Sequence, residues 1–151
     1  MTSLERGEPR VRIRPMEHED IDSVLAIDRR ITGVRRAVTY TDLITGDLGG
    51  VLALSLVAEV NGQVAGFILA QRAYVGEPVT EVGLIQILGV DPDYQRQGIA
   101  TGLVNALLDT CHSKKLSAVR ILFNVRDSQL QGLFEHLGFR RGELIDYTKT
   151  L

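Results

Sequence analysis

A short polar loop holds the residues of this sequence that are best suited to chemistry. It reads Gln-Arg-Gln-Gly-Ile-Ala-Thr over residues 95–101, between an apolar run and a segment with a helical apolar stripe. The first N–H groups of a helix have no partner inside the helix, and the helix dipole adds roughly half a positive charge there. Gly98 lacks the Cβ that would obstruct a close anion, and Ala100 leaves the next turn open. We therefore expect a pyrophosphate site formed by Gln95, Arg96, Gln97, Gly98, Ile99, Ala100 and Thr101.

This loop is not specific when it is considered alone. A glycine near a helix start is common, so the same residues also fit a loop that binds nothing. A Walker-type loop is excluded, because no Gly-Lys-Ser/Thr follows. A Rossmann fingerprint fits poorly, because the spacing lacks Gly-x-Gly and the loop follows a predicted antiparallel hairpin. Accompanying motifs must decide between a binding loop and an empty one.

The composition limits the other partners of the protein. Seventeen basic and 19 acidic residues give a net charge of −2, so we expect no nucleic acid, and any anion must be held by a local site. The single cysteine, Cys111, cannot form an intramolecular disulfide, and it lies on the apolar stripe of a predicted helix. No apolar run is long enough for a membrane span, and no metal-ligand spacing is present. We expect one cytoplasmic domain, residues 11–151, after a flexible arm, residues 1–10.

The periodicity of apolar residues predicts an α/β (α+β) domain. The dipeptide Asn61-Gly62 suits a type I′ turn, which accepts two positive φ angles, so the runs on either side should pair as a hairpin. Asp127 or Ser128 could cap the last helix. The predicted strands span residues 11–14, 51–60, 63–74, 83–90, 119–125 and 143–151, and the predicted helices span residues 18–30, 41–48, 100–115 and 128–137. This order predicts a mixed, mostly antiparallel central sheet flanked by about four helices.

Three motifs in this order resemble those of the GNAT superfamily of acyl-CoA-dependent N-acetyltransferases. They are Leu88-x-Val90-x-Pro92, then Gln95-x-x-Gly98-x-Ala100, then Leu133-Phe134-x-x-Leu137-Gly138-Phe139. The resemblance covers residues 11–151 in element order, and residues 90–98 are similar to those of ribosomal-protein N-terminal alanine acetyltransferases. It implies a GNAT-like fold, acetyl-CoA as co-substrate and a small-molecule or peptide amine as acceptor, without a metal.

The resemblance also implies roles for particular residues. The backbone of Leu88 and Val90 would pair with the pantetheine arm of coenzyme A, and the N–H of Leu88 would polarise the thioester carbonyl. Gly89, between them, fits a local bulge. Residues 95–101 would hold the pyrophosphate. Asp127 stands where the family usually has an asparagine that contacts the arm.

The usual proton-handling residues are absent from this sequence. Phe134 stands where many relatives have a tyrosine that acts as general acid, and Asn124 matches the position of a glutamate proposed as the base. Glu81 or Gln86 could hold a water that accepts the amine proton, and Tyr147 could reach the thiolate. Glu81 also fits a solvated turn residue, and Tyr147 a packing or surface tyrosine.

Four arginines bracket the loop before the second predicted helix, where the family often has its acceptor wall: Arg29, Arg30, Arg35 and Arg36. They could attract a carboxylate on the acceptor, and Arg35 and Arg36 are the candidates for the acceptor site. The alternative is a solvated basic surface.

Three functions remain open from the sequence. The first is an N-acetyltransferase in which a primary amine attacks acetyl-CoA directly in a ternary complex. The alternative is an acyl-CoA-binding sensor or partner subunit with weakened catalysis, and a plain interaction domain is a third reading. The final hairpin typical of the family looks truncated, so a free sheet edge could pair with another chain to form a homodimer.

Overall fold

The computed structural model describes residues 10–33 and 54–151. Its elements are β1(Val11–Pro15), the 3-10 turn η1(His18–Asp20), α2(Ile21–Thr32), β2(Leu56–Val60), β3(Gln63–Val75), β4(Thr80–Val90), the 3-10 turn η2(Pro92–Tyr94), α4(Ile99–Ser113), β5(Ala118–Ile121) and α5(Ser128–His136). The five strands form one sheet in chain order. Neighbouring strands are antiparallel except β4 and β5, which are parallel.

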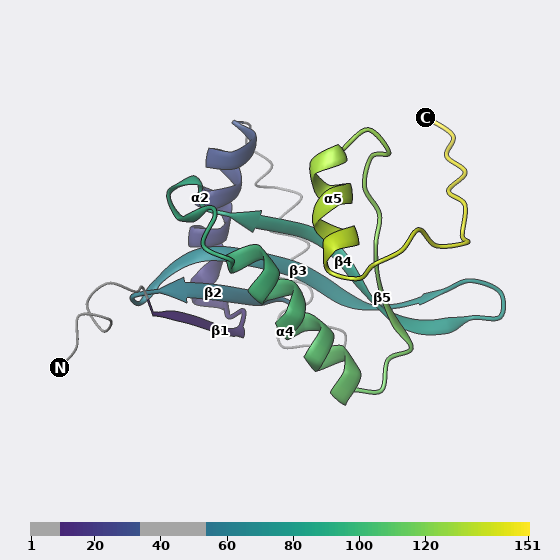
Figure 1. Ribbon diagram of the computed structural model, residues 1–151, viewed down its shortest axis with the longest axis horizontal. Coiled ribbons are helices and arrows are strands. Elements are labelled where there is room, and N and C mark those ends of the chain that lie inside the picture. The colour runs from purple at the N-terminus through teal and green to yellow at the C-terminus, as the bar shows by residue number, and fades with distance from the viewer. Residues whose placement is uncertain (1–9, 34–53) are drawn as a thin grey trace.

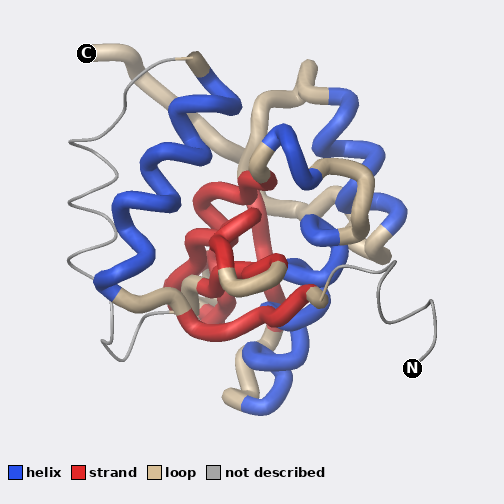
Figure 2. Tube along the Cα trace, turned by 90° about the vertical axis from the view of Figure 1, so that its left-hand side faces the viewer, coloured by secondary structure: helices blue, strands red, loops and turns tan. Residues whose placement is uncertain are grey.

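Helices cover both faces of this sheet (Figures 1 and 2). α4 and α5 pack on one face and α2 packs on the other. The prediction of a mixed, mostly antiparallel sheet is confirmed. The described part of the chain contains three α-helices rather than about four. The helix predicted over residues 41–48 lies outside the described residues.

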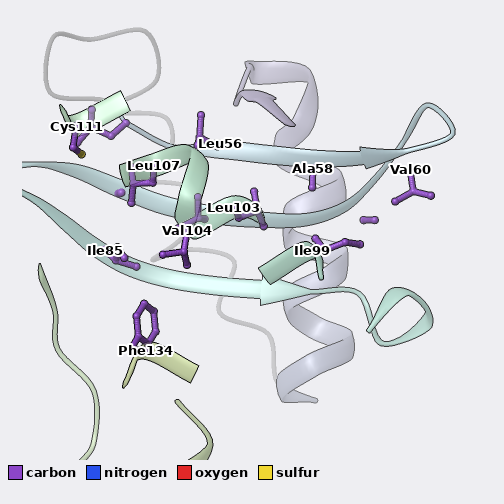
Figure 3. Close-up of a cluster of buried hydrophobic side chains, with 14 residues drawn as sticks. Leu56, Ala58, Val60, Ile85, Ile99, Leu103, Val104, Leu107, Cys111 and Phe134 are labelled. Atoms are coloured by element: carbon purple, nitrogen blue, oxygen red, sulfur yellow. The ribbon is translucent and has the colours of Figure 1, made fainter. Parts of the chain in front are cut away.

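The amphipathic stripe of α4 forms the larger core. Leu103, Val104, Leu107 and Cys111 are buried against side chains of β2, β3 and β4, and Figure 3 shows them gathered between the helix and the strands. The placement of Cys111 in the core is confirmed, and burial raises the pKa of its thiol. On the opposite face, side chains of α2 pack on Phe67 and other apolar residues of β2 and β3.

An ion-pair cluster fixes the start of α2 to the sheet. Arg14 on β1 donates from Nη1 and Nη2 to the two carboxylate oxygens of Asp20 at 2.7 and 2.8 Å, and from Nε to Glu59 at 2.6 Å. The Asp20 carboxylate also accepts the backbone N–H of Glu17 at 2.8 Å. The hydrogen bond from Arg14 holds the pKa of Asp20 below its usual range. These polar contacts help to orient α2, in addition to its apolar packing on the sheet.

The β2–β3 hairpin has the predicted turn. Asn61 and Gly62 both have positive φ, 52° and 83°, and Val60 pairs with Gln63 across them. A glycine and an asparagine are the residues that adopt this region at least cost. The sequence rule therefore located this turn correctly.

Three predicted boundaries were wrong. β4 begins at Thr80, so Glu81 lies within the strand rather than before it, because the hairpin with β3 continues to the pair Val75↔Thr80. β5 ends at Ile121 rather than residue 125, because the chain leaves the sheet there. Residues 143–151 form no strand in the single chain, because no strand of the described chain pairs with them.

Candidate functional site

The sheet opens between β4 and β5. The two strands pair from Val82↔Ala118 to Ile85↔Ile121, where β5 ends, while β4 continues to Val90. We call the opening between residues 86–90 of β4 and residues 122–126 after β5 the fork. Beyond Ile85, β4 has no described strand beside it on this side. A single extended ligand can therefore take the place of a neighbouring strand.

The backbone of β4 presents alternate amides to the fork. The N–H of Asp91 donates to the carbonyl of Ala65 on β3 at 2.7 Å. Successive N–H groups of a strand point to opposite sides, and the register of β4 with β3 is regular from Ile87 to Val90. The amides of Leu88 and Val90 therefore face the fork, as the pairing predicted from the sequence requires.

The bulge in β4 lies at Gln86 and not at Gly89. On β3, Leu69 pairs with Ile87 and the next residue pairs with Ile85, so Gln86 is the extra residue. Gly89 pairs regularly with Phe67. The bulge predicted at Gly89 was wrong, because the register of β3, which the local sequence does not show, sets which residue is extra. Gln86 therefore lies where β4 and β5 separate.

Packing, rather than a bulge, requires the glycine at position 89. A Cβ there would lie 2.8 Å from two ring carbons of Phe67 and 3.1 Å from Cδ1 of Ile31. Real Cβ contacts of this kind optimise at about 3.5–4.0 Å. The floor of the fork is thus closed by an aromatic ring packed directly on the backbone of β4.

The predicted pyrophosphate loop, residues 95–101, which we call the anion loop, leads into α4, where the first N–H groups of the helix are free. Gly98 is the residue before α4, with φ of 76°, and the first helical hydrogen bond runs from the N–H of Gly102 to its carbonyl at 2.9 Å. Gly98 has no side chain that could cap the helix, so the N–H groups of residues 99–101 have no protein acceptor in the described chain. A Cβ at Gly98 would meet no atom within 4 Å, so the space beside these amides is open.

An arginine from α2 holds the turn that leads into this loop. Arg30 donates from Nη1 to Asp91 at 2.6 Å, and its Nη2 lies 3.2 Å from the carboxylate of Asp93. The Asp91 side chain also accepts the N–H of Asp93 at 2.9 Å. These bonds raise the pKa of the Arg30 guanidinium, with the hydrogen bond to Asp93 as the main cause. The sequence indicated Arg30 only as part of a possible acceptor wall and did not predict its bond to Asp91, because the two residues are far apart in the chain.

The model of the acetyltransferase (GNAT) family matches residues 22–139. This chain belongs to the GNAT acetyltransferase family.

Solved structures of two acetyltransferases and one transcriptional regulator have the same fold. The aminoglycoside N-acetyltransferase AAC(6')-Iy in complex with CoA matches with a TM-score of 0.81 and 17% identity, over 95% of this chain and 96% of that chain. The ribosomal-protein-S18-alanine N-acetyltransferase of Escherichia coli matches with a TM-score of 0.73 and 23% identity, over 89% and 80%. A transcriptional regulator from Bacillus halodurans C-125 matches with a TM-score of 0.77 and 15% identity, over 93% and 100%. At these identities the likeness concerns the fold.

α5 carries the third GNAT motif on the other side of the fork. Asp127 caps the helix, as predicted, by accepting the N–H of Leu130 at 3.0 Å. Phe134, where relatives have a tyrosine, is only 2% exposed. Its ring stacks on Phe123 at 6.1 Å and meets the edge of Phe139 at 5.0 Å. In this GNAT chain Phe134 packs the wall of the fork and has no proton to give.

The structure does not bring Glu81 or Tyr147 to the fork. Glu81 lies at the paired end of β4, 3.4 Å from Arg72 and seven residues, or about 20 Å, from Leu88. Tyr147 is 94% exposed in the tail. Asn124 accepts the N–H of Arg126 at 2.8 Å and is exposed beside the fork. Arg35 and Arg36 lie outside the described residues.

The described residues contain neither a candidate metal cluster nor a membrane-spanning helix. No group of three or more His, Cys, Asp and Glu side chains within residues 10–33 and 54–151 could hold a metal ion. Within the same residues, no helix has the length and apolar character needed to cross a membrane.

Proposed function

We propose that this GNAT protein transfers an acetyl group from acetyl-CoA to a primary amine of a small molecule or peptide. The observation that carries the proposal is the free N–H groups at the start of α4, which lie at the end of the same β4 strand that opens the fork. Backbone amides and the positive end of a helix dipole bind a pyrophosphate without any basic side chain. This suits a protein whose net charge is −2.

The fork would hold the pantetheine arm of the co-substrate. The backbone groups of Leu88 and Val90 face it and can pair with the amides of the arm as a strand would. The N–H of Leu88 would then donate to the thioester oxygen, where negative charge develops during attack. One such donor typically contributes about 10²–10³-fold to the rate. Asp127, at the start of α5, remains a candidate for a contact with the arm.

The reaction requires only modest help with protons. The neutral amine forms a C–N bond as the C–S bond breaks, and the thiolate leaves with a pKa of about 8.5 when it is compared with cysteine. An ammonium group of pKa about 8–10 must first lose its proton. We infer that a water held by Gln86, at the point where β4 and β5 separate, takes this proton and passes it to the solvent. Rate would then come mainly from alignment of the amine with the thioester.

Two structural neighbours support the choice of co-substrate. AAC(6')-Iy was solved with CoA and with a bisubstrate analogue, CoA-S-monomethyl-acetylneamine. Other neighbours are described as aminoglycoside or ribosomal-protein-alanine acetyltransferases. They share an amine acceptor and differ in its size, which supports the reaction class and leaves the acceptor to be found by assay.

Calorimetry with CoA tests the binding half of the proposal. Gly98→Glu should abolish binding, because its side chain and charge would occupy the open space beside the amides. Gly33→Glu is a matched control. Gly33 also has positive φ, 72°, and open surroundings, so both variants carry the same backbone strain. Absent binding to the unmodified protein, or equal binding by the two variants, would refute the site.

A thiol-release assay tests the chemical half. The protein is incubated with acetyl-CoA and a panel of amino acids, peptides and small amines, and released CoA is measured. We expect turnover with at least one acceptor, and loss of that turnover in Gly98→Glu. The burial of Phe134 where relatives have a tyrosine favours the second candidate, an acyl-CoA-binding sensor or partner subunit. Tight CoA binding without turnover on the whole panel would select that candidate.

A further inference from the structure

One face of the fork, the face on the side of α2, is bordered by aliphatic side chains. A Cβ at Gly89 would lie 3.1 Å from Cδ1 of Ile31, which belongs to the last turn of α2. Ile87, two residues earlier on β4, packs with the apolar residues beneath the same helix. The Ile31 side chain is 44% exposed. The helix thus brings an exposed apolar side chain to the position next to Leu88, whose N–H is the proposed donor to the thioester.

The other arm of the fork adds a second aliphatic side chain to this face. Ile121 and Phe123 both pack in the larger core, on the side of α4 and α5. Successive side chains of an extended chain point to opposite faces, so Leu122 points to the side of α2. It is 68% exposed. Arg120 has the same orientation, but a Cβ at Gly142 would lie 3.1 Å from its Nη1, so its guanidinium lies beside the chain that follows α5.

The proposed acetyl transfer leaves this aliphatic face to the acceptor. The side chains of Leu88 and Val90 pack in the larger core and fill the opposite face of the fork. The free amides of α4 lie on that opposite side, so the proposed co-substrate enters from there. A thioester that pairs with β4 as a strand has its plane near that of the sheet, and an amine attacks a carbonyl from above or below its plane. The side of α2 is therefore the one that the amine uses.

We propose that Ile31 and Leu122 select the acceptor, and that the acceptor is an amine with an aliphatic or aromatic group within a few bonds of its nitrogen. The inference rests on the proposed function and names its substrate class. An apolar group on the acceptor would remove the exposed parts of both side chains from water.

A polycationic acceptor such as an aminoglycoside does not suit this face. Its ammonium groups would lose hydration beside two aliphatic side chains. The carboxylates of Asp91 and Asp93, which follow β4, are already paired with Arg30. The selection therefore differs from that of the aminoglycoside acetyltransferases whose fold the chain shares.

Paired acceptors test the selection in the thiol-release assay with acetyl-CoA. Leucinamide and asparaginamide present the same α-amine on side chains of nearly the same shape, and only the first side chain is apolar. We expect kcat/KM to be about tenfold higher for leucinamide, the usual size of an apolar contact in a pocket. Phenethylamine should likewise be a better acceptor than kanamycin. Turnover without these preferences would overturn this inference alone, and turnover with no amine would overturn the proposed function as well.

Two variants locate the preference on the two side chains. Ile31→Asn and Leu122→Asn should each lower kcat/KM for leucinamide about tenfold, through KM, and change it little for asparaginamide. Val79→Asn is the matched control, because Val79 is also exposed (62%) but lies in the turn before β4, at the far end of that strand from Leu88. All three variants should bind CoA in calorimetry as the unmodified protein does, which verifies that the fold is intact. A preference that survives in both Ile31→Asn and Leu122→Asn would overturn the inference.

Discussion

Gly89→Ala should destabilise the protein because of Phe67. The added methyl would lie 2.8 Å from Cε1 and Cζ of the ring, about 1 Å inside the optimal contact distance. Phe67 is completely buried, so the ring has no free space to move into. Overpacking of this kind costs about 1–3 kcal/mol, and the lower backbone entropy of alanine returns about 0.5–1 kcal/mol. The expected net loss in the free energy of unfolding is about 1–2 kcal/mol.

A double-mutant cycle with Phe67→Leu separates this cause from others. Phe67→Leu alone should cost about 1–2 kcal/mol, since it removes buried ring atoms. In the Gly89→Ala background the same change relieves the overlap. The double variant should therefore be more stable than the sum of the single effects by about 1–2 kcal/mol. Urea unfolding followed by circular dichroism, with linear extrapolation, measures each term.

Gly132→Ala is the control for the effect of a glycine alone. Gly132 lies within α5, and a Cβ there would meet no atom within 4 Å, so alanine should stabilise by about 0.5–1 kcal/mol. Additivity of the Gly89→Ala and Phe67→Leu effects within about 0.5 kcal/mol would refute the packing argument. So would a Gly89→Ala protein of full stability that has lost only CoA binding, since the glycine would then serve the ligand.

Three further predictions concern polar contacts. Hydrogen bonding to Arg14 lowers the pKa of Asp20 in the folded state, so the contribution of Asp20 to stability is complete above the unfolded pKa and is lost as the pH falls through the folded pKa. Asp20→Asn should cost about 1.5–3 kcal/mol at pH 7 and flatten the acid limb of urea-unfolding midpoints measured from pH 2 to 7. An unchanged acid limb would contradict this prediction. Arg30→Gln should raise the dissociation constant for CoA several-fold in calorimetry, because it removes the bonds that hold the turn before the anion loop. Arg29→Gln, at an exposed position on the same helix, should leave the constant unchanged. Equal dissociation constants for the two variants would count against this prediction. Asp127→Ala should lower stability in thermal unfolding by about 1 kcal/mol, because the cap of α5 is lost. Asp127→Asn should retain most of the capping contribution, since asparagine is also a good cap. Equal losses in the two variants would exclude capping.

Features set by near neighbours in the chain could be predicted from the sequence. The Asn61-Gly62 turn follows from the φ angles that these two residues accept, and both angles are positive in the structure. The stripe from Leu103 to Cys111 follows from helical periodicity, and those side chains are buried. The helix start after Gly98 is local as well, which is why it could be predicted before the fold was known.

Features set by distant parts of the chain could not be predicted in the same way. The residue that bulges, Gln86, depends on how β3 aligns with β4, and the glycine at 89 suggested the wrong position. The end of β5 at Ile121 fixes where the fork begins, although apolar residues continue to Val125. Glu81 appeared near the site because the strand was predicted too short at its start. Register and strand length are properties of pairs of strands, and one strand's sequence specifies them weakly.

The distance between the anion loop and the fork is set by a residue that belongs to neither. Gly66 on β3 pairs with Val90, and a Cβ there would lie 2.9 Å from Cγ2 of Ile99 and 3.4 Å from Cδ1 of Leu103. Only a glycine lets the first turn of α4 settle this closely on the sheet. The amides that follow Gly98 are therefore held against the end of β4 by packing beneath them. Because the flexible arm between a pyrophosphate and a thioester has a limited reach, this contact helps to determine whether the same molecule can reach both places.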